Sequence, residues 1–129
     1  MKRVALFVAA ILVLAGVFRA GVAYGQNKYG TPKTVLHVVV GKWKAEATDE
    51  QKKAAIDAVR TMAAKVPGIK NVWLKTDRVQ PREYHYAIAI EFESRAAADA
   101  YAEHPAHEEW YKVYQPIREE SRSHQITNE

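Results

Sequence analysis

The sequence predicts an α+β domain with the element order strand, helix, strand, strand, helix, strand, preceded by an export signal. Three observations lead to this prediction. Residues 34–43 form an apolar run of strand length, a helix with a start signal follows over residues 48–66, and residues 84–93 alternate between large apolar and other side chains. With right-handed crossovers, this order gives a ferredoxin-like βαββαβ sheet that has both helices on one face.

The start of the chain is typical of a secretory signal peptide. Two basic residues, an apolar run from Val4 to Phe18 and a group of small residues follow one another. Because the run is shorter than the roughly 20 apolar residues of a spanning helix, we interpret residues 1–25 as a cleaved signal and residues 26–33 as a linker. The alternative is an uncleaved membrane anchor. The mature protein is expected to be secreted or periplasmic, without membrane attachment.

The composition argues against several classes of function. Of the 19 Lys and Arg residues, three lie in the signal, which leaves 16 basic against 15 acidic residues in the mature chain. A net charge of +1 without a basic stripe argues against nucleic acid as a partner. The chain has no cysteine, so disulfides, thiol nucleophiles and thiolate metal sites are excluded.

The first strand, Thr34–Trp43, is apolar at nearly every position, as expected of a strand that is covered on both faces. Thr48 and Gln51 match a capping box at the start of the next helix, and Pro67-Gly68 ends that helix. The remaining elements are expected as a strand over residues 69–75, the alternating strand over 84–93, a helix over 94–103, a helix from Pro105 to about Glu120 and a weak strand over 121–127.

The sheet face that points away from the helices is predicted to be apolar. Leu36, Val38 and Val40 point there from the first strand, and Ala87 and Ala89 from the third. Because monomers rarely expose such a patch, we expect two sheets to pack face to face around a twofold axis. The prediction is a homodimer that forms an α/β barrel, and the alternative is a monomer with a tolerated apolar face.

Four segments, in order, resemble the stress-responsive dimeric α/β-barrel (Dabb) family. They are the first strand with its histidine in Thr34–Lys44, the turn Val66–Ile69, the third strand in Tyr84–Ser94, and the signature Tyr-x-x-His-Pro-x-His at Tyr101–His107. We interpret residues 34–129 as one Dabb domain. The resemblance implies a dimeric ferredoxin-like barrel, in agreement with the fold predicted from the pattern.

The resemblance also implies a candidate site. One plant member of the family is a polyketide cyclase in which a tyrosine and a histidine of the signature act as an acid/base pair, and these fall on Tyr101 and His107. This chain departs from that cyclase in three places. Tyr86 stands where the cyclase has a histidine, and Gly41 stands where the cyclase has a larger apolar residue. The tail Ser121–Gln125 is more polar than the last strand of the cyclase. The expected ligand pocket between sheet and helices is lined by His37, Val39, Tyr86, Ile88, His104 and Trp110.

Residue chemistry leaves a structural alternative for each histidine. His37 is expected to be either a hydrogen-bonded core residue or a pocket group. His104 is expected to cap the helix that begins at Pro105. His107 beside the Tyr101 phenol is suited to proton transfer, because the break at Pro105 lets side chains six positions apart converge.

A metal site is the further alternative for the same region. It would use His104, His107 and Glu108, with His85 as another ligand, since three or four nitrogen and oxygen ligands can hold zinc. Pro105 between the histidines is better explained by helix initiation. We therefore predict neither a metal nor a cofactor.

Three classes of function stay open. The first, which we favour, is a stress-related dimeric module that binds a small apolar ligand, with Trp110, Tyr111 and Tyr114 as an aromatic wall. The second is a lyase-type or cyclase-type enzyme that uses Tyr101 and His107 as its acid/base pair. The third is an oxidative enzyme, by analogy with monooxygenases that share this barrel.

Overall fold

The computed structural model describes residues 11–19 and 30–129, and the chain divides into two units, Met1–Thr31 and Pro32–Glu129. In the first unit, residues 11–19 are helical. The predicted signal peptide and linker fall partly outside the described residues. Every helix in the described ranges is too short or too polar to span a membrane.

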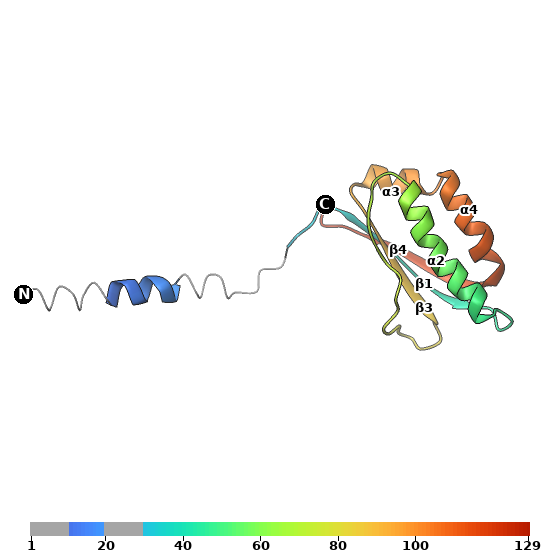
Figure 1. Cartoon of the computed structure of the whole chain (residues 1–129), viewed down its shortest axis with the longest axis horizontal. Coiled ribbons are helices and arrows are strands. Elements are labelled where there is room, and N and C mark those ends of the chain that lie inside the picture. Colours follow the sequence, from blue (N-terminus) through green and yellow to red (C-terminus); the bar gives the residue numbers. More distant parts are fainter. Residues whose placement is uncertain (1–10, 20–29) are drawn as a thin grey trace, which may run out of the picture. The chain divides into compact units, whose positions relative to one another are not determined.

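The second unit is a four-stranded antiparallel sheet with the strand order β2-β3-β1-β4. Helices α2 and α4 lie side by side and cover the same face of this sheet (Figure 1). The predicted α+β class and ferredoxin-like topology are confirmed. The elements are β1 (Val35–Trp43), α2 (Asp49–Lys65), β2 (Ile69–Trp73), β3 (Tyr86–Phe92), α3 (Arg95–Tyr101), α4 (Pro105–Tyr114), a 3-10 turn (Gln115–Ile117) and β4 (Arg118–Ile126).

The start of α2 is fixed by the capping box that the sequence predicts. The Gln51 backbone N–H donates to Thr48 Oγ1 at 3.2 Å, and the Thr48 N–H donates to Gln51 Oε1 at 2.9 Å. After the helix, Gly68 has φ of 81°, and a Cβ at this position would lie 2.5 Å from the Cβ of Ala97. Glycine is therefore required both by the backbone conformation of this turn and by its contact with α3.

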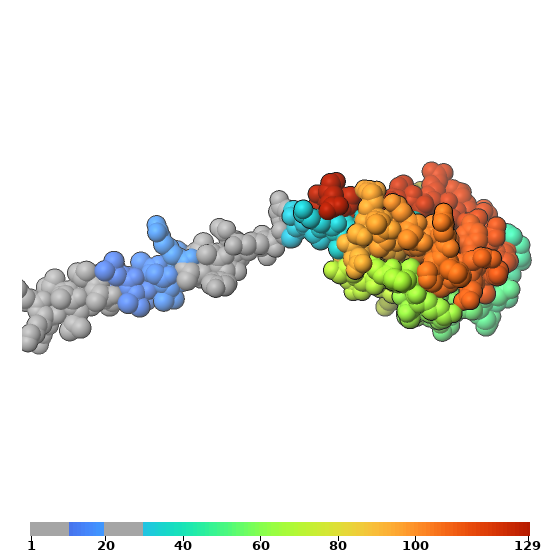
Figure 2. Space-filling model, turned by 90° about the horizontal axis from the view of Figure 1, so that it is seen from above, coloured from blue at the N-terminus to red at the C-terminus, as the bar shows by residue number. Residues whose placement is uncertain are grey.

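The core lies between the sheet and the helices. On β3 and on β1, alternate side chains are buried against the helices, among them Val39, Ile90 and Phe92. Val59 and Met62 from α2 pack onto them. Figure 2 shows the helical surface, where the end of α2 (green) abuts the α3–α4 region (orange). The outward-facing residues on β1 and β3 are half-buried, in the predicted alternation.

The C-terminal part of the domain differs from the sequence prediction. The helix expected to run to about Glu120 ends at Tyr114, because Pro116 has no N–H to bond the carbonyl one turn earlier. After the 3-10 turn, β4 starts at Arg118 and forms a strand of nine residues along β1, rather than a weak strand from Ser121.

Two strands are shorter than predicted because side chains replace backbone partners at their ends. The Trp43 N–H donates to Nδ1 of His85 at 2.9 Å, so β3 begins at Tyr86 instead of residue 84. β2 ends at Trp73 instead of residue 75. Beyond it, Thr76 Oγ1 accepts from the Ala87 N–H at 2.8 Å and donates to the Ala87 carbonyl at 3.0 Å.

Candidate functional site

A cavity of about 230 Å³ lies between the sheet and α4, and we call it the helix-side cavity. Strands β1 and β4 and helix α4 supply its walls, together with the end of α3. Its lining residues are His37, Val39, Tyr101, Ala102, His107, Trp110, Tyr111, Tyr114, Arg118, Ser121 and Ser123.

The break between α3 and α4 brings the predicted acid/base pair together in this cavity. α3 ends at Tyr101, and Nδ1 of His104 accepts from the Ala106 N–H at 3.1 Å, which caps α4 just before Pro105. The redirected chain places the ring centroids of Tyr101 and His107 at 4.5 Å in an edge-to-face arrangement. The predicted convergence of Tyr101 and His107 is thus present.

Burial sets the protonation of this pair. It raises the pKa of the Tyr101 hydroxyl, which has no hydrogen-bond partner within the described part of the chain. It also lowers the pKa of His107, against an opposing contribution from the Ala102 carbonyl. At neutral pH the pair is therefore a neutral phenol beside a neutral imidazole, which has one donor and one acceptor nitrogen.

His37 enters the cavity from β1, with its ring centroid 5.8 Å from that of Tyr101. Its Nδ1 atom is buried without a hydrogen-bond partner in the described residues. Burial, and next the proximity of His107, lower the pKa of His37. A buried polar atom without a partner costs about 1–3 kcal/mol. The internally hydrogen-bonded alternative therefore does not hold for this atom in the described residues.

The structure sorts the other predicted pocket residues into two groups. Val39 and Trp110 line the helix-side cavity, whereas Tyr86, Ile88 and His104 do not. The cavity lies over β1 and β4, and Tyr86 and Ile88 belong to β3, on the opposite side of β1. Predicting that Ile88 shares the cavity of His37 was wrong for this reason.

Each excluded residue has a different environment. Ile88 is buried in the core. The Tyr86 hydroxyl bonds to the Tyr114 hydroxyl, while its ring stacks on Trp43 with centroids 4.0 Å apart. His104 caps α4 and lines a separate hollow beside Gly68.

The residues of the metal alternative are used in other ways. Nδ1 of His85 accepts from Trp43, Nδ1 of His104 accepts from Ala106, and Glu108 pairs with Lys112 at 3.2 Å. Among residues 11–19 and 30–129, no group of three or more His, Asp or Glu side chains could hold a metal ion.

Sequence reasoning missed one wall of the cavity, which β4 supplies. Arg118, Ser121 and Ser123 line the cavity from this strand, which was expected to begin only at Ser121. Nη1 of Arg118 donates to the Tyr111 hydroxyl at 2.9 Å and to Ser121 Oγ at 3.3 Å. The spacing of Ser121 and Ser123 by two residues indicates that both side chains lie on one face of a strand. Deciding which face this is requires the pairing of β4 with β1.

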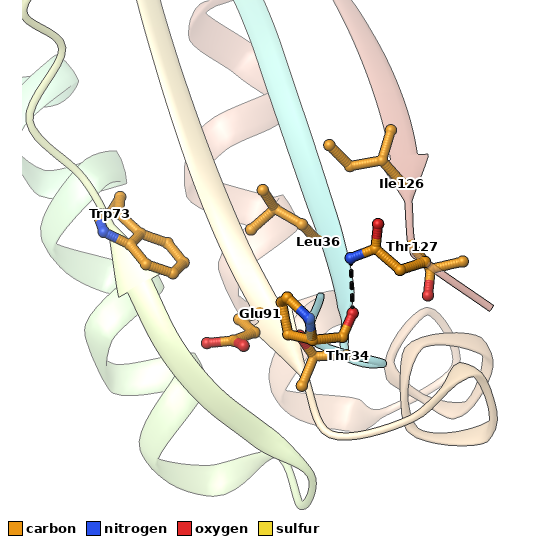
Figure 3. A pocket seen from close by; sticks show the side chains of 8 residues that line it. Thr34, Leu36, Trp73, Glu91, Ile126 and Thr127 are labelled. Carbon is orange, nitrogen blue, oxygen red and sulfur yellow. Dashed lines mark hydrogen bonds between the residues drawn. The ribbon is translucent and has the colours of Figure 1, made fainter. Parts of the chain in front are cut away.

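The opposite face of the sheet carries a second pocket, of about 310 Å³ (Figure 3). Leu36, Trp73 and Ile126 stand on this face, with the helices behind the sheet. Trp73 is 51% exposed and Ile126 is 58% exposed. We call this surface the outer face.

Comparisons with known proteins agree with this architecture. Residues 35–127 match the family model described as the Stress responsive A/B Barrel Domain (Dabb). The chain is 30% identical over 88 residues to olivetolic acid cyclase from Cannabis sativa, and the match covers 66% of this chain and 87% of the cyclase.

Solved structures show the same fold. Hydroxynitrile lyase from Passiflora edulis superimposes with a TM-score of 0.64 at 21% identity, covering 74% of this chain and 93% of the lyase. A dimeric ferredoxin-like protein from Bacteroides fragilis gives a TM-score of 0.61 at 19% identity, covering 76% of this chain and 99% of that chain. Together with the match of the family model over most of the second unit, these findings confirm the resemblance: the chain belongs to the stress responsive A/B barrel domain (Dabb) family.

Proposed function

We propose that the protein is an exported homodimeric domain that binds a small organic ligand in the helix-side cavity. The observation that carries this proposal is the state of the polar atoms there. His37 Nδ1 is buried without a partner, and the Tyr101 hydroxyl beside it makes no hydrogen bond within the described residues. Because folded proteins normally satisfy buried polar atoms, a bound molecule that supplies the missing partner accounts for His37 Nδ1.

The shape and lining of the cavity restrict the ligand. Its volume of about 230 Å³ is below the roughly 300–1,000 Å³ of pockets for drug-sized molecules. Trp110, Tyr111 and Tyr114 supply aromatic surface, which suits an apolar or flat ligand body. The ligand is therefore small, with an apolar part and at least one polar group that reaches His37 or Tyr101.

Untargeted mass spectrometry of what co-purifies with the native protein tests the binding proposal. We expect a small molecule that is retained by the wild type and lost from His37→Leu, since leucine fills a similar space without a polar atom. Thr61→Leu, which changes an exposed residue of α2 outside the cavity and the outer face, is the control and should retain the ligand. Recovery of equal amounts from wild type and His37→Leu would contradict the proposal.

A second candidate function is proton-transfer catalysis of the lyase or cyclase type. The specific observation in its favour is the neutral imidazole of His107 in edge-to-face contact with the Tyr101 phenol. In this mechanism His107 removes a proton from the carbon next to a carbonyl, and the Tyr101 hydroxyl donates to the oxygen on which negative charge develops. The cyclase and the hydroxynitrile lyase among the similar proteins motivate carbonyl compounds and cyanohydrins as trial substrates.

Kinetics separate this candidate from simple binding. If the pair is catalytic, His107→Asn and Tyr101→Phe should each lower kcat at least about 100-fold while ligand affinity changes little. If the cavity only binds, both variants weaken affinity and no turnover occurs with any trial substrate. The third class, an oxidative enzyme, rests on the shared barrel alone and stays a prediction.

The homodimer is supported by the outer face and by the similar structures. Leu36, Val38 and Val40 line this face on β1, next to the exposed side chain of Trp73. Similar structures from Bacteroides fragilis and two further bacteria are described as dimeric. A second copy that packs its own outer face against this one buries these side chains and completes a barrel.

Val38→Asp tests the dimer. An unpaired charge buried in the interface costs several kcal/mol, so the variant should be monomeric or aggregated in sedimentation experiments at micromolar concentration. Asp substitution of Thr61, on the helical side of the domain, serves as the control and should leave the dimer intact. A wild type that sediments as a monomer would remove the dimer from the proposal.

Export is the remaining part of the proposal. It is motivated by the order of basic, apolar and small residues within residues 1–25. N-terminal sequencing of secreted or periplasmic material should begin near Tyr24 or Gln26. An intact Met1 in a membrane fraction would show that the segment is an anchor.

A further inference from the structure

β4 differs from its neighbours on the side that it turns to the helices. Its register places Ser121 opposite Gly41 and Ser123 opposite Val39, and both serines line the helix-side cavity. On β1 and β3, the same side carries mostly buried apolar residues. Ser121 is half-buried and Ser123 is exposed on this edge strand, so β4 gives the cavity a polar wall where β1 and β3 carry apolar side chains.

Arg118, the first residue of β4, brings a positive charge to this wall. The carbon of its guanidinium lies 5.4 Å from the ring centroid of Tyr111 and 5.5 Å from that of Tyr114. Nη1 donates to the Tyr111 hydroxyl and to Ser121 Oγ. These contacts place the guanidinium at the cavity, and Arg118 as a whole residue is half-buried.

No carboxylate forms an ion pair with Arg118 in the described part of the chain. The nearby Glu120 contacts other cations, Lys42 at 3.6 Å and Arg122 at 3.0 Å. A guanidinium has five N–H donors, and both hydrogen bonds that Arg118 donates leave from the same nitrogen. The donors that remain suit an anion that arrives from outside the chain.

We propose that Arg118, Ser121 and Ser123 form a carboxylate-binding subsite and that the ligand of the helix-side cavity is a small organic acid. Guanidinium matches carboxylate with two parallel hydrogen bonds, and the serine hydroxyls add donors beside it. Anchoring the acid at β4 directs the rest of the ligand across the aromatic wall to Tyr101 and His107. The inference rests on the proposed function, because it requires the cavity to be a ligand site.

The test compares acids with their uncharged isosteres. Benzoate, cinnamate and hexanoate are titrated against the full mature protein by two-dimensional NMR, each beside its primary amide. We expect the acids to bind about tenfold more tightly than the amides, as hydrogen bonds to a charged group allow. Arg118→Gln should remove this preference. Arg60→Gln, which changes an exposed arginine of α2 paired with Asp57, is the control and should keep the preference.

A second set of variants tests the subsite if Arg118→Gln does not fold. Arg118→Lys keeps the charge but lacks the planar fork, and Ser121→Ala/Ser123→Ala keeps Arg118 and removes two donors. Each should reduce the acid preference severalfold.

The outcomes distinguish the two proposals. If neither acids nor amides shift the resonances of cavity residues, the proposed ligand site itself is wrong. If acids and amides bind equally, or if the acid preference survives in all Arg118 variants, the cavity is a ligand site without a carboxylate subsite, and Arg118 only packs against the two tyrosines.

Discussion

Two clusters of ring side chains lie on the helix side of the sheet, and they differ in how their polar atoms are satisfied. The clusters are the closed cluster of Trp43, Tyr86 and Tyr114 and the open cluster of His37, Tyr101 and His107. In the closed cluster, the two tyrosine hydroxyls bond to each other. In the open cluster, the rings touch equally closely, but His37 Nδ1 has no partner in the described residues.

This difference separates polar groups that serve the packing of the core from polar groups that can serve a ligand. Hydroxyls that satisfy one another within the core require nothing from outside, so the closed cluster can be understood as packing. In the open cluster two half-buried histidines flank the buried Tyr101, and at His37 Nδ1 hydrogen-bonding capacity is left over in the described residues. The comparison indicates that satisfaction of polar atoms distinguishes the candidate site from the core beside it.

The closed cluster depends on a missing side chain. A Cβ on Gly41 would lie 2.1 Å from the Tyr86 hydroxyl oxygen and 2.8 Å from the Glu120 carbonyl oxygen. Tyr86 therefore occupies the space that a side chain at position 41 would fill. Two departures from the cyclase pattern in the sequence, a tyrosine at 86 and a glycine at 41, are thus one structural feature.

The largest expected effect is that of Gly41→Val. The new side chain must displace the Tyr86 ring and press on the backbone of β4, so we expect a loss of at least about 3 kcal/mol in the free energy of unfolding. Urea unfolding of the mature domain measures it. Gly30→Val is the control, because a Cβ there meets nothing within 4 Å. Equal stability of Gly41→Val and wild type would mean that the closed cluster rearranges freely.

A double-mutant cycle tests whether Tyr86 occupies the space of a side chain at position 41. Gly41→Ala and Tyr86→Leu should be less destabilising together than the sum of the single variants, because leucine no longer reaches over position 41. The clash with the Glu120 carbonyl remains, so the rescue should be partial.

The next effect is that of Tyr86→Phe. It leaves the buried Tyr114 hydroxyl without its partner, which should cost about 1–2 kcal/mol. Adding Tyr114→Phe removes the orphaned hydroxyl, so the double variant should be no less stable than Tyr86→Phe alone. An additive loss in urea unfolding would instead show that each hydroxyl has a separate partner.

The two clusters also mark what sequence reasoning can reach. Strand and helix order, the cap at Thr48 and the meeting of Tyr101 with His107 follow from local patterns: periodicity, capping chemistry and the break before Pro105. These features depend on residues close in the chain, where physical rules are strong.

The misassigned residues depend on contacts between distant segments. Ile88 and Tyr86 face the helices as predicted, but the strand order puts β3 on the far side of β1 from the cavity. Arg118 was missed because it was assigned to a helix, although Pro116 two residues earlier was the available sign that the helix had ended. Burial of a polar atom without a partner, as at His37, has no sequence pattern at all.

Acidification should weaken the fold through the open cluster. Burial lowers the pKa of both His37 and His107, so below about pH 6.5 the unfolded chain binds more protons than the folded one and stability falls with pH. Carboxylates with a lowered pKa, such as Glu91 and Glu120, add to the loss only at lower pH. The expected loss between about pH 7 and about pH 5 is smaller than that caused by Tyr86→Phe.

Unfolding curves at several pH values test this origin. His37→Gln/His107→Asn should flatten the dependence in that range. An unchanged slope in the double variant would assign the acid sensitivity to groups outside the open cluster.

The smallest effect on stability is expected for Tyr101→Phe, and the contrast with Tyr86→Phe makes it informative. Both substitutions remove one hydroxyl from a buried tyrosine. In the closed cluster, removing the Tyr86 hydroxyl leaves the Tyr114 hydroxyl without its hydrogen bond. The Tyr101 hydroxyl has no hydrogen-bond partner in the described residues, so its removal leaves no other group unsatisfied. The free energy of unfolding should therefore stay within about 0.5 kcal/mol of wild type, while ligand binding or turnover in the cavity declines. If Tyr101→Phe were as destabilising as Tyr86→Phe, a buried water or another group would have to satisfy Tyr101 in the free protein. The open cluster would then be a second structural network, and the case for a ligand site would rest on Arg118 and β4 alone.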